Sequence, residues 1–104
     1  MRLDISAEAA AFARANGGEL WVWAAYPRLC CSGSPAWMHA ATIRPAGLNG
    51  FAAVETAGAA LAAGVQVHFR QLSGQAPAVL EVGMQGRRHP KVQAYWDGCL
   101  MAMI

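Results

Sequence analysis

The pattern of residues near the start of the chain predicts a helix that has a capping residue before it and glycines after it. An alanine-rich run, Ala7–Ala15, follows Ser6, a residue type favoured as a helix N-cap. An acidic side chain in the first turn and a basic one in the last turn complement the helix dipole. Gly17 and Gly18 then supply the left-handed conformation that ends many helices. The pattern therefore predicts a helix over residues 6–16.

A strand is expected directly after these glycines. Residues 19–26 are rich in aromatic and β-branched side chains and end at Pro27. One face of this strand carries Leu20, Val22 and Ala24, and the other carries Trp21, Trp23 and Ala25. Because both faces are apolar, we expect a strand that is central in its sheet or covered on both sides.

The remaining segments read mainly as short strands separated by turns. Further strands are expected at residues 37–44, 64–70, 78–84, 92–95 and 99–104, with Thr42 and Ile43 as the β-prone part of the first of these. Glycine and proline place a loop at 27–35 and turns at 45–50 and 73–77. Residues 51–63 are ambiguous: Phe51, Val54 and Leu61 have helical spacing, but Thr56 and Gly58 weaken a helix and alanine discriminates poorly. We expect one domain spanning residues 1–104, of the α+β class: an N-terminal helix followed by short, mostly antiparallel or mixed strands.

Composition and charge narrow the range of functions. The chain has 104 residues, of which 56% are hydrophobic and 13% charged, so it can bury enough apolar surface to fold. Its formal net charge of +2 argues against nucleic acid as a partner, because such binding requires a clustered basic face. The densest basic stretch, Arg87–Lys91, is interpreted as a solvated loop between strands rather than a phosphate site.

Membrane insertion and export are not expected. No stretch approaches the ~20 consecutive apolar residues of a membrane-spanning helix. An acid, Asp4, stands where a signal peptide would have its apolar run. The expected location is the cytoplasm, where three cysteines indicate thiols for metal or redox chemistry rather than a disulfide framework.

The cysteines are the residues most suggestive of chemistry. Cys30 and Cys31 are adjacent in the expected loop, and Cys99 follows 68 residues later (99 − 31). Adjacent cysteines are poor joint ligands for one ion and more often supply one ligand or form a vicinal disulfide. The paired spacing of zinc sites is absent from the sequence. Spacing alone therefore leaves metal ligation and buried, unreactive thiols equally open.

The residues around the cysteines resemble a known family. The helix at Ser6–Ala10, the run Cys31-Ser32-Gly33, the segment Gly64–Val67 and the late Gly98-Cys99 occur in the order found in the HesB-like domain of A-type iron–sulfur cluster carriers. Cys30-Cys31 and the ending Tyr95–Cys99 are similar to the small CC/Se-motif (seleno)protein branch, in which selenocysteine can replace a cysteine. The resemblance covers nearly the whole chain in order, and the cysteine segments are its specific part. It implies a HesB-like folded sheet or pseudobarrel.

The resemblance also implies a ligand set. Cys31 matches the first conserved cysteine of the carriers, and Cys99 matches the first member of their C-terminal Cys-Gly-Cys. Met101 stands where the third family thiol would be, and a thioether is a poorer iron ligand than a thiolate. Cys30 takes a position that is usually glycine and is the candidate third thiol. The cofactor implied is an iron–sulfur cluster or iron, commonly shared across a homodimer and passed to iron–sulfur assembly or client proteins.

Two other functions fit the same cysteines. A thiol redox protein would cycle Cys30 and Cys31, or Cys31 and Cys99, between dithiol and disulfide. A structural or interaction domain could have kept the fold and lost the site. Catalysis by a general acid and base is not expected, because no two of the six acidic residues are placed by a motif for that work.

The remaining polar and aromatic residues have structural interpretations. His68 should face solvent beside Gln66 and Arg70, and His39, although nearer the cysteine loop, is expected to be structural as well. Asp97-Gly98 is typical of a hairpin turn, and Met101 belongs to a terminal strand with an edge free for a partner chain. The four tryptophans are expected in the core or an interface, because no basic residue is interleaved with Trp21 and Trp23 in residues 19–26.

Overall fold

Two sheets and two helices make up the computed structural model, which describes residues 1–26, 36–55, 58–72 and 74–102. The three-stranded sheet has the order β1-β6-β7, and the five-stranded sheet has the order β4-β5-β2-β3-β8. The element bounds are β1 Arg2–Ile5, α1 Ala7–Ala15, β2 Glu19–Ala25, β3 Ala36–Ala41, β4 Ala52–Val54, α2 Gly58–Ala63, β5 Gln66–Arg70, β6 Val79–Gln85, β7 Lys91–Trp96 and β8 Met101–Ala102. The fold is therefore α+β, as expected.

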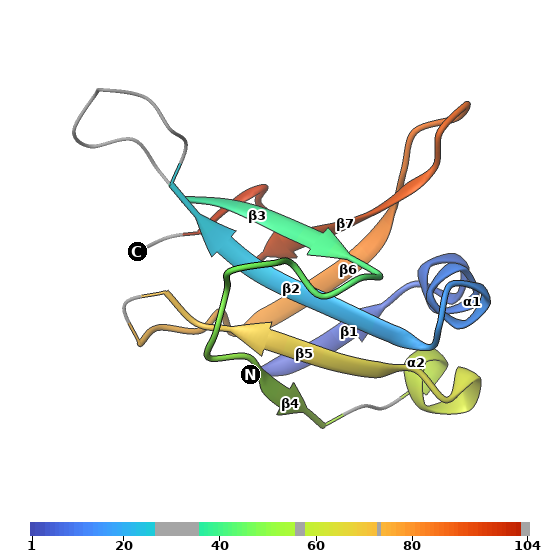
Figure 1. Ribbon diagram of the computed structural model, residues 1–104, viewed down its shortest axis with the longest axis horizontal. Coiled ribbons are helices and arrows are strands. Elements are labelled where there is room, and N and C mark those ends of the chain that lie inside the picture. Colours follow the sequence, from blue (N-terminus) through green and yellow to red (C-terminus); the bar gives the residue numbers. More distant parts are fainter. Residues whose placement is uncertain (27–35, 56–57, 73, 103–104) are drawn as a thin grey trace.

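The sheets are mixed. The pairs β1–β6 and β2–β5 are parallel, whereas the other paired strands are antiparallel. In Figure 1, β6 and β7 pass behind β2 and β3, and both helices lie at one end of the strands. The side-chain amide of Gln93 on β7 donates to the Met38 carbonyl of β3 at 3.3 Å and so joins the two sheets. The described strands form two packed sheets, neither of which closes into a barrel.

The predicted helix and central strand are confirmed. The Ser6 hydroxyl accepts from the Ala9 amide at 3.1 Å, so the N-cap forms as the residue type indicates. β2 occupies the middle of the five-stranded sheet, and its side chains Leu20 and Val22 are fully buried. With Val67 and Leu80 they are the largest completely buried side chains, and they mark the core between the sheets and the helices.

Several expectations require correction. β1 was not predicted, and residues 51–63, which were left open, contain both a strand and a second helix. The expected strand at 37–44 begins at Ala36 and ends at Ala41, so Thr42 and Ile43 lie beyond it, with Ile43 78% exposed. The reason is topological: after Ala41 the chain leaves the sheet and crosses in front of β2 to reach β4 (Figure 1).

A side chain from α1 holds the end of α2. The Arg14 guanidinium donates through Nη1 to the Ala63 carbonyl at 2.6 Å, and thus satisfies one of the free carbonyls at that helix end. Gly64 follows with φ +70°, and a Cβ there would lie 3.1 Å from Arg14 Nη1. Arginine and glycine therefore fit together at this junction.

We expect Arg14→Met to lower the free energy of unfolding by about 1 kcal/mol, the net contribution of one such hydrogen bond. Methionine retains most of the aliphatic stem, so the loss reports on the donor. Urea unfolding followed by circular dichroism measures it. Arg2→Met is the matched control, because Arg2 is exposed and its ion pair with Asp4, at 3.7 Å, is at the surface. Equal stability of the two variants would contradict the capping role.

Candidate thiol site

The two adjacent cysteines lie outside the described residues. Cys30 and Cys31 belong to segment 27–35, which connects Tyr26 at the end of β2 to Ala36 at the start of β3. The two anchors are fixed by the antiparallel β2–β3 pair, in which Ala25 faces Trp37. The end of β2 and the start of β3 lie at the end of the sheet opposite the helices (Figure 1).

Cys99 is held by a tight turn and is a free, exposed thiol. Trp96 and Cys99 exchange two backbone hydrogen bonds, of 2.7 and 2.8 Å, around Asp97 and Gly98. These two turn residues have φ angles of 47° and 83°, the left-handed pair that a two-residue hairpin of type I′ requires. The predicted hairpin turn is therefore confirmed.

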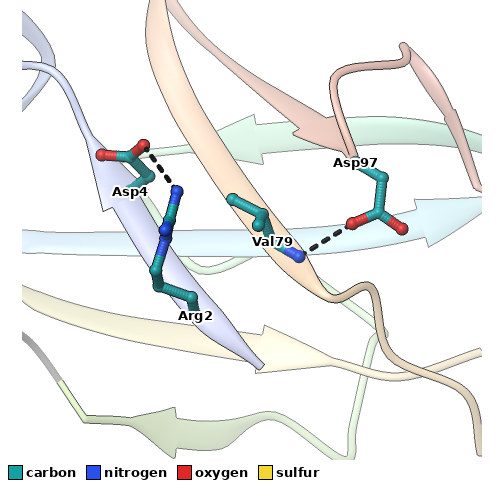
Figure 2. A network of polar contacts seen from close by, with 4 residues as sticks. All are labelled: Arg2, Asp4, Val79 and Asp97. Carbon is teal, nitrogen blue, oxygen red and sulfur yellow. Dashed lines mark hydrogen bonds and ion pairs between the residues drawn. The ribbon is translucent and has the colours of Figure 1, made fainter.

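Asp97 also ties this turn to the start of β6. Its Oδ1 accepts from the Val79 amide at 2.8 Å, and its own amide donates to the Val79 carbonyl at 3.0 Å. Figure 2 shows the side-chain bond beside the Arg2–Asp4 ion pair on β1. The position of Cys99 is thus set by the backbone of β7 and by a side-chain contact to β6.

Pairing between β8 and β3 joins the Cys99 turn to the strand that follows segment 27–35. Ala36 faces Ala102, Trp37 faces Met101, and the Met38 amide donates to the Leu100 carbonyl at 2.8 Å. Ala36 directly follows segment 27–35 and pairs with Ala102 of β8. Cys99 lies three positions before Ala102. In extended backbone that interval is ~10 Å. Parts of the chain more than 60 positions apart are therefore neighbours here.

Met101 lies on the same short strand, opposite the exposed Trp37. The terminal strand predicted for this region is confirmed at Met101–Ala102, and it pairs with β3 of its own chain. The Met101 side chain is exposed. It is a weaker ligand for iron than a thiolate.

The described residues contain no group of three or more His, Cys, Asp or Glu side chains arranged to hold a metal ion. His39 stacks on Trp23, with ring centroids 5.5 Å apart, and has a structural contact as expected. Partial burial, followed by the positive charge of Lys91, lowers the pKa of His39 from its ordinary value. The lowered pKa favours the neutral imidazole form of His39.

His68 differs from expectation. Its side chain is only 16% exposed, and its ring stacks on Trp21 at a centroid distance of 4.0 Å and an interplanar angle of 13°. Its Nε2 lies 3.3 Å from Glu19 Oε1. The parallel β2–β5 register places His68 directly beside Trp21, and this neighbour on the adjacent strand is what takes the ring out of solvent.

An aromatic cluster on the outer face of the five-stranded sheet was not foreseen. Phe51 packs edge-on against Trp21 and Trp23, with ring centroids 5.2 and 6.3 Å away. Arg44 lies over Trp21 at 5.5 Å from the ring centroid, and Arg70 Nε donates to the Asn49 carbonyl at 2.7 Å. Residues 42–51, which we call the crossover, are therefore fixed to the sheet through aromatic and cationic contacts. Arg44 and Arg70 lie outside residues 19–26, so the sequence of that strand could not reveal these cationic contacts.

Comparison of the chain with protein-family models, curated proteins and solved structures finds no match in any of the three. Among the described residues, no helix has the length and hydropathy needed to cross a membrane.

Proposed function

We propose that this protein binds iron or an iron–sulfur cluster through Cys31 and Cys99, with Cys30 as the third thiolate, and passes that cargo to another protein. The supporting observation is the β3–β8 pairing, which joins the Cys99 turn to the strand that begins directly after the Cys30–Cys31 segment. The order of motifs that resembles HesB-like carriers supports the same assignment.

The chemistry of the thiols fits a cargo of this kind. Thiolates are the ligands that iron–sulfur clusters take up, and each thiol loses its proton on binding. Cys99 is exposed on a two-residue turn, so a metal bound there would remain accessible to the thiols of a client. Exposed ligands favour transfer over permanent retention. Three thiolates per chain are one short of the usual four, so the proposal includes a homodimer that shares the cargo.

Anaerobic incubation of the full chain with ferrous iron and sulfide tests the proposal. We expect sulfur-to-iron charge-transfer absorbance, with iron and acid-labile sulfide measured per chain. Cys31→Ser and Cys99→Ser should each abolish nearly all of this signal, because each removes a ligand that no other residue replaces. Cys30→Ser should reduce the signal less, since Cys30 is the auxiliary thiolate.

Met101→Leu is the matched control, because it changes an exposed side chain two residues from Cys99 without removing a thiol. It should bind as much iron as the unsubstituted chain. Absence of the absorbance in the unsubstituted chain, or equal absorbance in Cys31→Ser and Cys99→Ser, overturns the proposal. A mass decrease of two hydrogens after mild oxidation, in a chain that binds no metal, would assign thiol–disulfide redox chemistry instead.

A further inference from the structure

The hairpin formed by β6 and β7 extends beyond the rest of its sheet. β1 pairs with β6 only as far as Val82, whereas the β6–β7 ladder continues through Gly83–Gln93 and Met84–Val92 to Gln85–Lys91. In Figure 1 the end of this hairpin projects away from the body of the molecule. Its tip, residues 86–91, is therefore accessible from several sides.

The backbone of the tip is fixed in a tight loop. Gly86 has φ +92°, and a Cβ at that position would lie 2.9 Å from the carbonyl oxygen of His89. Only glycine fits so close to the returning strand. Pro90 restricts the other side of the loop, directly before Lys91 re-enters the ladder. A loop held at both ends loses little conformational entropy when a partner binds.

Positive charge is concentrated at this tip. Arg87, Arg88 and Lys91 are all exposed, and no ion pair found in the described parts of the chain includes any of them. They contribute +3, so the rest of the chain carries 5 − 6 = −1 of the total of +2.

We propose that the tip of the β6–β7 hairpin is a docking site for an acidic segment of another protein. Two adjacent guanidinium groups match carboxylates, which accept paired hydrogen bonds from the guanidinium fork. Three cations on a narrow loop suit a few clustered carboxylates. They are too few for the six to ten phosphate contacts that give nucleic-acid binding its strength. This surface goes beyond the thiol chemistry and does not depend on it.

Fluorescence anisotropy with a fluorescein-labelled decaglutamate peptide, at low salt, tests the docking site in the full chain. We expect Arg87→Ala combined with Arg88→Ala to weaken binding about tenfold, because two exposed ion pairs are lost. The affinity of the double variant Arg87→Lys and Arg88→Lys should lie between those of the double alanine variant and the unsubstituted chain. Lysine keeps the positive charge but lacks the guanidinium group that donates paired hydrogen bonds. Binding should weaken as salt is raised.

The matched control is Arg2→Ala combined with Arg44→Ala, which removes the same charge from exposed positions away from the tip. Circular dichroism checks that each variant is folded. Equal weakening by the control, or no binding of the peptide, overturns the proposal. Tighter binding of an oligodeoxythymidylate of matched charge would assign the tip to nucleic acid and also overturn it. Cys31→Ser and Cys99→Ser should bind the peptide normally, which separates this result from that of the thiol site.

Discussion

Replacement of Leu20 by alanine is expected to lower the free energy of unfolding by about 2–5 kcal/mol. Leu20 is completely buried on β2, the middle strand of the five-stranded sheet, beside the equally buried Val67 of β5. Its truncation removes buried apolar atoms and leaves a cavity that rigid strands on both sides cannot refill. Small domains are stable by only about 5–15 kcal/mol, so the change is large. Urea unfolding followed by circular dichroism measures it.

Ile43→Ala is the matched control, since it removes a similar side chain that is 78% exposed on the crossover. Its effect should stay within about 0.5 kcal/mol. A loss below about 1 kcal/mol for Leu20→Ala would show that this position is not in the core. The placement of β2 in the core would then have to be revised.

Replacement of Asp97 by alanine is expected to lower the free energy of unfolding by about 1–3 kcal/mol. The Val79 amide loses its charged acceptor at 2.8 Å, and alanine must adopt the left-handed conformation at φ 47°. Because this turn positions Cys99, the iron bound in the reconstitution experiment should also fall. Thermal or urea unfolding gives the first effect, and iron per chain gives the second.

Asp97→Asn separates the causes. Asparagine tolerates the left-handed region and its side-chain oxygen can accept from the same amide, so most of the stability should remain. Equal losses in the alanine and asparagine variants would mean that the negative charge, rather than the turn geometry and the hydrogen bond, stabilises this corner.

Local sequence signals located the elements whose conformation depends mainly on residues close to them in the chain. The N-cap Ser6, the alanine run and the two glycines define α1 without reference to any other part of the chain. Asp97 and Gly98 define their turn in the same way, because few residue types accept two successive positive φ angles. β2 was recognisable because a strand buried on both faces has an unbroken apolar run.

Elements that depend on a distant partner were missed or misplaced. β1 has only four residues, and it exists as a strand because β6 pairs with it in parallel. In residues 51–63 the abundant alanines suit either a helix or a strand, and only pairing with β5 makes β4 a strand. β3 stops at Ala41 although Thr42 and Ile43 favour strands, because the chain must cross the sheet to reach β4.

The candidate site likewise has some features that local sequence sets and others that depend on distant parts of the chain. The sequence by itself determined the three thiols and the turn that carries Cys99, because residue type and local backbone preference suffice for these. Only the tertiary structure decided that β8 pairs with β3, that Arg44 reaches Trp21, and that three basic residues stand on a projecting tip. Each of these features depends on how segments that are remote in the chain are placed relative to one another. Strand register and buried surface select them, and neither is encoded in any single stretch of residues.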